Sequence, residues 1–235
     1  HRQSLRLSGH RRGDRLRRRP GDLPGGVRRP PETTGICRSD GGAKLVLTKA
    51  GNHANLITVL ELNHFYSEKE AVCAGTFTKD VVKAAPVVWD RDVVYKEGKA
   101  QAVVVNSGIA NACTGEEGLA NCKKEAQKAG ELLNVAPEHV LVASTGVIGA
   151  QLVMDVVEKG IEMLVPQLAY GKEAGEDAAT AILTTDTCKK EIAVECTLGG
   201  KTVTLGGMCK GAGMIHPNMG TMLSFITSDA AIDQK

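Results

Sequence analysis

The stretch AVVVNSGIANACTGEEGLANCKKEAQKAGELLNVAPEHVLVASTG, residues 102–146, decides the fold. It opens with a β-branched run and ends on another apolar run at His139–Ala143. Such short runs predict buried strands. Between them, apolar residues three or four apart predict an amphipathic helix over Glu116–Asn134 with charges on the opposite face. The segment thus predicts a strand–helix–strand unit. Its helix buries Leu119, Cys122, Ala126, Ala129 and Leu133.

Further along the chain, the pattern predicts helices over about Met154–Leu168 and Gly171–Leu183. The runs at 191–196 and 201–205, joined across Leu198-Gly199-Gly200, predict a β-hairpin. Thr221–Thr227 predicts one more strand, and residues 39–70 give no clear element. A hairpin among alternating helices and strands favours a mixed α/β (α+β) fold with helices packed on sheets.

Composition excludes several classes of protein. The 235 residues lack the unbroken run of about 18–20 apolar residues that a membrane span needs. Only 3% of residues are aromatic, which disfavours a base-stacking surface for nucleic acid. The net charge of +2 comes from the first 38 residues, which hold 11 Arg, whereas residues 39–235 have a net charge of −6. We therefore expect neither nucleic acid nor membrane as a partner.

Residues 1–38 are predicted to be a disordered basic tail, and residues 39–235 a single domain. The seven cysteines form no CxxC pair and no Cys/His ligand spacing, so no metal site is expected. An odd number of cysteines favours free thiols and a cytoplasmic location. An organellar location is the alternative if the Arg-rich segment is a transit peptide.

Three strand-to-loop junctions combine glycines with polar side chains, a pattern typical of anion or oxyanion binding. They are NSGIAN at 106–111, STGVIG at 144–149 and GGMCKGAGMIHPNMG at 206–220. Lys210, between small neighbours in the last junction, is either a reachable cation or a solvated loop residue. A phosphate-binding loop is excluded because Glu195 stands where its first glycine would be.

Thr221 is a candidate nucleophile because it follows Gly220 in this loop. A Thr hydroxyl needs an adjacent base, and the free α-amine of an N-terminal Thr can supply one. Cleavage of the Gly220–Thr221 bond would create that amine, and glycine before the bond leaves its carbonyl open to attack. From spacing alone, a Thr that merely opens a strand remains the alternative.

Five blocks of sequence, in this order, resemble the ornithine acetyltransferase family (glutamate N-acetyltransferases) of arginine biosynthesis. They are AGTFTKDVVKAAPV at 74–87, VVVNSGIANACTGEEG at 103–118, VLVASTGVIG at 140–149, AILTTDT at 181–187 and KGAGMIHPNMGTMLSFIT at 210–227. The resemblance covers about residues 71–235. It implies stacked sheets flanked by helices in a self-cleaving fold of the N-terminal-nucleophile type.

The resemblance also implies the chemistry. The precursor cleaves itself between Gly220 and Thr221 into an α chain and a β chain that assemble as a heterotetramer. Thr221 then carries an acetyl group from N-acetylornithine to glutamate. The oxyanion hole falls on Thr145 and Gly146. Substrate contacts fall on Thr184, Lys210 and Thr221. No cofactor is implied, and acetyl-CoA is an alternative acetyl donor.

The sequence departs from the family pattern at two positions, and it ends early. Gly220 replaces the usual Ala, and Ile109 replaces an Asn, which removes an amide near the expected site. The chain ends 15 residues into the β chain, before the family's remaining Glu, Asn and Thr ligands. We therefore expect an inactive fragment of a larger enzyme. The alternatives are a related self-cleaving aminopeptidase or amidohydrolase, and a non-catalytic fragment that binds amino acids.

Overall fold

The structure is a computed structural model that describes residues 45–49, 61–211 and 222–233. The predicted tail at 1–38, and the predicted cleavage pair Gly220 and Thr221, lie outside the described residues. Within the described ranges, the strands form a four-stranded and a three-stranded sheet. Among the same residues, no helix has both the length and the apolar character needed to cross a bilayer.

The four-stranded sheet has the order β1-β2-β3-β4. Its strands are β1 (Leu45–Lys49), β2 (Glu61–Val72), β3 (Lys99–Ile109) and β4 (Val140–Val147). β1–β2 and β2–β3 pair antiparallel, whereas β3 and β4 pair parallel. Parallel neighbours need a crossover connection, which helix α2 (Gly115–Leu133) provides. The predicted strand–helix–strand unit is therefore confirmed.

One face of this sheet is covered by helices. They are α1 (Ala85–Asp92), α2 and α3 (Met154–Leu164), with a π-helical turn at Val93–Glu97 and 3-10 turns at Pro137–His139 and Val165–Gln167. Alternate residues of β3 and β4 point to this face. They form a core with the helices, whose fully buried members include Cys122, Ala126, Ala129, Val140, Val142, Val157, Ile161 and Leu164.

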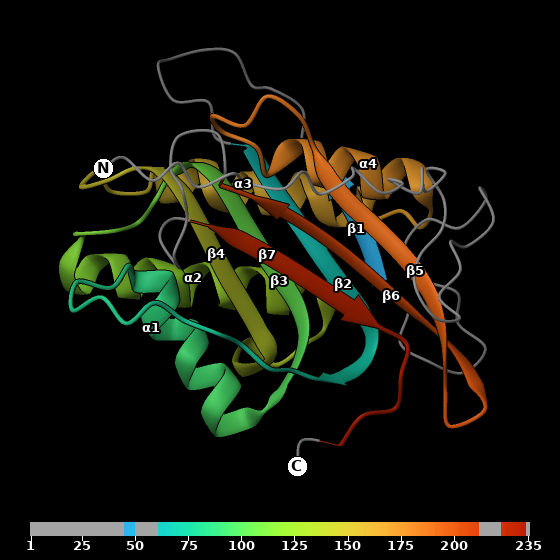
Figure 1. Cartoon of the computed structure of the whole chain (residues 1–235). Coiled ribbons are helices and arrows are strands. Elements are labelled where there is room, and N and C mark those ends of the chain that lie inside the picture. Colours follow the sequence, from blue (N-terminus) through green and yellow to red (C-terminus); the bar gives the residue numbers. More distant parts are fainter. Residues whose placement is uncertain (1–44, 50–60, 212–221, 234–235) are drawn as a thin grey trace, which may run out of the picture.

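The other face carries helix α4 (Lys172–Ala181) and the second sheet. That sheet is antiparallel throughout, in the order β5 (Lys190–Leu198), β6 (Lys201–Lys210), β7 (Leu223–Ser228). In Figure 1 it lies across the front of the four-stranded sheet. A second core joins the two sheets and α4, with Phe65, Val105 and Met208 among its members. The rings of Phe65 and Phe225 lie 4.8 Å apart in it.

The predicted helices and the hairpin are confirmed, with small changes at their ends. α3 stops before Pro166, because proline has no N–H for the helical ladder. The prediction for α2 was wrong about two side chains. Leu119 is 39% exposed rather than buried, and Glu125, assigned to the charged face, is fully buried. No element was predicted for β1, β2 and α1.

Candidate active site

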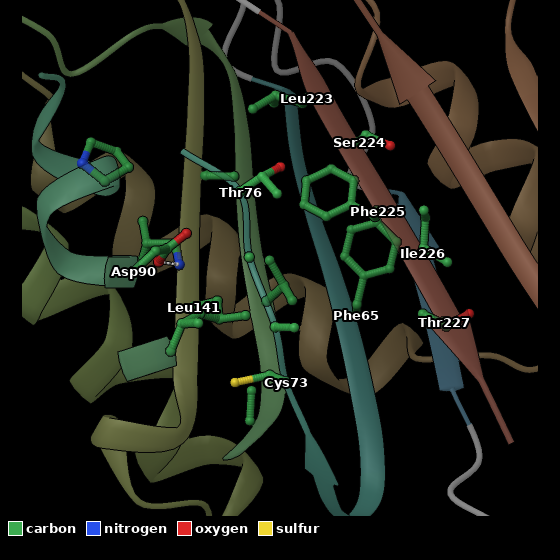
Figure 2. A pocket seen from close by; sticks show the side chains of 18 of the residues that line it. Phe65, Cys73, Thr76, Asp90, Leu141, Leu223, Ser224, Phe225, Ile226 and Thr227 are labelled. Carbon is green, nitrogen blue, oxygen red and sulfur yellow. Dashed lines mark hydrogen bonds between the residues drawn. The ribbon is translucent and has the colours of Figure 1, made fainter. Parts of the chain in front are cut away.

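A groove of about 2240 Å³ lies between the two sheets. Figure 2 shows Phe65 and Phe225 side by side in it, with Leu141 and Asp90 on the wall formed by β4 and α1. Four of the residues expected at the site also line it: Thr145, Gly146, Thr184 and Lys210. The groove exceeds the roughly 300–1,000 Å³ of an ordinary ligand pocket, so it has ample room for an amino acid derivative.

Lys210 brings three elements together at the groove. It is the last residue of β6, and its Nζ atom donates to Thr145 Oγ1 of β4 at 2.9 Å. The same Nζ donates to Thr184 Oγ1, in the connection between α4 and β5, at 2.6 Å. Lys210 is 4% exposed and Thr145 is 1% exposed. An ammonium has three N–H donors, so one donor of Lys210 is left for a ligand.

The charge of Lys210 is set by two opposing effects. Burial lowers its pKa, and the nearby carboxylate of Asp186 raises it, with burial the larger effect. The Asp186 side chain is 1% exposed and ion-pairs with Lys190, Oδ1 to Nζ, at 3.4 Å. Its Oδ2 accepts the N–H of Gly211, the residue after Lys210, at 2.6 Å. The sequence did not single out Asp186. Its place in the block AILTTDT at 181–187, two residues after Thr184, was the available signal.

Gly146 lies where the backbones of β4 and β3 approach closely. It pairs with Gly108 in the parallel register and has a φ of +132°. A Cβ atom at Gly146 would lie 2.1 Å from the carbonyl oxygen of Gly108. Only glycine allows this approach together with this backbone conformation. The close contact holds the end of β4, and with it Thr145, at the groove.

Two asparagines of the NSGIAN junction serve the fold, contrary to the anion-binding interpretation of that segment. Asn106 Nδ2 donates to Ile109 O at 2.7 Å and Ser144 Oγ at 2.9 Å. Asn111 Nδ2 donates to Gly118 O at 3.0 Å. The side chain of Ile109 packs in the helix-side core, 4% exposed. The substitution at Ile109 therefore changes the core rather than the groove.

Ser107 lies in the same junction, but the sequence analysis did not single it out. It pairs with Thr145 across β3 and β4, and strand alternation places both on the groove side of the sheet. Ser107 is 4% exposed, and its Oγ has no hydrogen-bond partner among the described residues. A buried hydroxyl without a partner is uncommon in proteins. Its position in the register with Thr145 was not readable from the sequence.

The described residues contain no group of three or more His, Cys, Asp or Glu that could hold a metal ion. The described cysteines are free thiols: Cys113 and Cys188 are exposed, Cys122 is buried, and Cys73, Cys196 and Cys209 are in between. Burial raises the pKa of the Cys122 thiol. Cys122 therefore packs as a small apolar side chain of the helix-side core.

Comparison with known proteins fits this arrangement. A sequence model of the ArgJ family matches residues 48–235. The chain belongs to the ArgJ family. The sequence resemblance to ornithine acetyltransferases is thereby confirmed, over a range that begins earlier than residue 71.

Curated ArgJ relatives are similar over most of this chain. The arginine biosynthesis bifunctional protein ArgJ of Caldanaerobacter subterraneus subsp. tengcongensis is 52% identical over 174 residues, which are 74% of this chain and 42% of the relative. The ArgJ of Thermotoga neapolitana is 49% identical over 175 residues, 74% of this chain and 43% of the relative. The chain thus spans about two fifths of the length of these relatives.

Solved ArgJ structures share the fold. The Bacillus halodurans ArgJ structure superimposes with a TM-score of 0.67 at 37% identity, covering 77% of this chain and 92% of that one. The Mycobacterium tuberculosis ornithine acetyltransferase, solved with ornithine, gives 0.67 at 35% identity, covering 75% and 93%. The predicted mixed α/β fold with stacked sheets flanked by helices is therefore confirmed.

Proposed function

We propose that the complete protein transfers an acetyl group from N-acetylornithine to glutamate through an acetyl ester on Thr221. Membership of the ArgJ family supports this proposal. So do the names of the relatives, which place them in arginine biosynthesis, and the solved ornithine acetyltransferase that binds ornithine. We propose acetyl-CoA as an alternative donor and a heterotetramer of α and β chains. The free thiols favour the cytoplasm.

The observation that carries the proposal is the buried ammonium of Lys210 between two hydroxyls in the groove. N-acetylornithine and glutamate both carry an α-carboxylate. The third N–H of Lys210 can pair with that carboxylate, and such charge-assisted hydrogen bonds are strong. One cation would then orient donor and acceptor in turn, as a reaction with two successive amino acid substrates requires.

The nucleophile would form by self-cleavage. Thr221 Oγ attacks the Gly220 carbonyl carbon, the peptide C–N bond breaks, and the amine takes the hydroxyl proton, which leaves an ester. Water then hydrolyses the ester to the Gly220 carboxylate and a free Thr221 hydroxyl. The new α-amine can serve as the base beside that hydroxyl.

Transfer would follow in two steps. Thr221 Oγ attacks the acetyl carbonyl of N-acetylornithine while the α-amine accepts the hydroxyl proton. The amide C–N bond breaks, and ornithine leaves with that proton. The α-amine of glutamate then attacks the acetyl ester, releasing N-acetylglutamate and returning a proton to Thr221 Oγ. Thr145 and Gly146 would stabilise the oxyanion of each tetrahedral intermediate, a role worth about 3–4 kcal/mol per donor.

The test uses the protein expressed from its full reading frame. Intact mass spectrometry measures cleavage, and a radiolabelled-acetyl assay measures transfer to glutamate. We expect two chains and transfer in the unmodified protein, and one chain without transfer in Thr221→Ala. Thr197→Ala, at an exposed position on β5, is the matched control and is expected to cleave and transfer normally.

The outcomes separate the alternatives. Cleavage before residue 221 in Thr221→Ala would overturn the assignment of the nucleophile. Release of free acetate without transfer to glutamate would indicate a hydrolase of the aminopeptidase or amidohydrolase kind. Binding of ornithine by an uncleaved, inactive complete protein would indicate a non-catalytic amino-acid-binding protein.

A further inference from the structure

Asp186 has a buried carboxylate to which the proposed reaction assigns no role. Both of its oxygens are engaged, one by the N–H of Gly211 at 2.6 Å and the other by the Nζ of Lys190 at 3.4 Å. Its side chain is 1% exposed. Burying a carboxylate is costly unless it is paired and hydrogen-bonded. These contacts meet that cost, and one of them is made with the residue that follows Lys210.

The contacts hold both the side chain and the backbone at Lys210. Thr184 and Asp186 lie two residues apart in the connection from α4 to β5. Thr184 accepts from the Lys210 side chain, and Asp186 accepts from the Gly211 backbone. Gly211 has a φ of +117°, a conformation that favours glycine. The hydrogen bond that the Gly211 N–H donates to Asp186 holds the backbone in this conformation.

Asp186 also supplies the negative charge near Lys210. Burial lowers the pKa of Lys210, and Asp186 is the group that raises it. Among the described residues, the elements around Lys210 add little other charge. β4 and β7 carry no ionisable side chain. On β6, Lys201 lies at the far end and Cys209 points to the opposite face. In the connection and β5, Lys190 pairs with Asp186, while Lys189 pairs with Glu176 and Glu191.

We propose that Asp186 is a positioning residue for Lys210: it fixes the Lys210–Gly211 backbone and keeps the buried ammonium protonated for a substrate carboxylate. This inference rests on the proposed function only for the role of Lys210 in binding substrate. The effect of Asp186 on Lys210 itself can be measured without turnover.

The test is an NMR titration of the complete protein labelled with [ε-13C]lysine, in which Lys210→Arg identifies the Lys210 signal. Asp186→Asn keeps an oxygen for the Gly211 N–H and removes the charge. We expect its Lys210 midpoint to fall by about one pH unit, since a nearby opposite charge shifts a pKa by about 1–3 units. Asp177→Asn changes an exposed carboxylate on α4 and is the matched control. An unchanged midpoint in Asp186→Asn would overturn the proposal.

A second variant, which should shift the Lys210 midpoint in the opposite direction, tests the proposal if Asp186→Asn does not fold. Lys190→Gln removes a cation that pairs with Asp186, at a side chain that is 35% exposed. Its Lys210 midpoint should rise, and an unchanged or lower midpoint would contradict the proposal. In the transfer assay, Asp186→Asn should raise KM for glutamate about tenfold with a smaller change in kcat, and Asp186→Glu should restore part of the loss.

The two proposals fail separately. If the unmodified protein shows no acetyl transfer but the midpoints shift as expected, the proposed function falls and the role of Asp186 stands. If transfer occurs and the midpoints do not move, Asp186 has only a structural role.

Discussion

The ammonium of Lys210 donates to the hydroxyl of Thr145 at 2.9 Å across 65 residues of sequence. The bond joins the two sheets, because Lys210 ends β6 and Thr145 lies near the end of β4. Thr184 adds a second hydroxyl from a third element. The candidate site therefore depends on how the sheets stack, and each of its contacts can be removed separately.

Replacing Thr145 by Val should weaken transfer. The change keeps the shape and removes the oxygen that accepts from Lys210, leaving a buried donor short of a partner. A lost partner costs about 1–3 kcal/mol, so we expect kcat/KM to fall about 5- to 150-fold. Thr145→Ser keeps the hydroxyl and should lose much less. A larger loss in Thr145→Ser than in Thr145→Val would mean that the methyl group, rather than the hydroxyl, matters.

Replacing Lys210 by Met should abolish the recognition of amino acid carboxylates. Loss of one partner of a buried charge pair costs about 2–5 kcal/mol, which calorimetry with ornithine and glutamate can measure. Lys159→Met, at an exposed position on α3, provides the control and should bind normally. Unchanged affinity in Lys210→Met would place the carboxylate elsewhere.

Replacing Gly146 by Ala should destabilise the protein and impair transfer. Its Cβ would lie 2.1 Å from the Gly108 carbonyl oxygen, so β3 and β4 would have to move apart. Gly149 is a matched control, because its φ is +83° and a Cβ atom there would have no neighbour within 4 Å. Gly149→Ala should lower the free energy of unfolding only by the cost of placing a Cβ atom in a left-handed conformation, about 1–2 kcal/mol. Urea unfolding should show that Gly146→Ala is the less stable variant.

The buried carboxyls of Asp90 and Glu125 should make stability depend on pH. Burial raises the pKa of both to about 8, and neither Glu125 oxygen has a hydrogen-bond partner in the part of the chain that the structure describes. In the unfolded chain these groups ionise near pH 4, whereas in the folded protein they stay protonated until about pH 8. Their contribution is therefore fully present at low pH and is lost as the pH rises through this range.

Glu125→Met removes one of these carboxyls at similar volume. It should raise the free energy of unfolding at pH 8 by about 1–3 kcal/mol and flatten its decline between pH 5 and pH 8. Glu158→Met, at a partly buried position on α3, is the comparison. A decline as steep as that of the unmodified protein would show that Glu125 is not its source.

Sequence patterns were sufficient where one residue type recurs with a regular period. The spacing over Glu116–Asn134 predicted α2, and the two runs around Gly199-Gly200 predicted β5 and β6. β2 was missed because its sequence, ELNHFYSEKEAV, mixes charged and apolar residues without clear alternation. α1 was missed although Pro86 stands in its first turn, a common start signal.

Local patterns singled out the junctions that hold Thr145 and Lys210, but only the family resemblance joined them with Thr184 into one site. Thr145, Thr184 and Lys210 lie far apart in sequence, and no local pattern shows that they meet. Glu125 shows a related limit, since a charged residue in an amphipathic helix is normally placed in solvent. Its burial follows from the packing of α2 against its neighbours, which the helix's own sequence does not contain.

The paired glycines Gly108 and Gly146 also disfavour a shift in register between β3 and β4. A slip of one residue would turn Thr145 toward the helices and bring Ser144 to the groove, because side chains alternate along a strand. The neighbours of Gly108 are Ser107 and Ile109, both of which carry a Cβ atom. The close approach of the two backbones is possible only in the native pairing and is lost when one strand shifts along the other. Folding intermediates with a shifted register would therefore lack this contact.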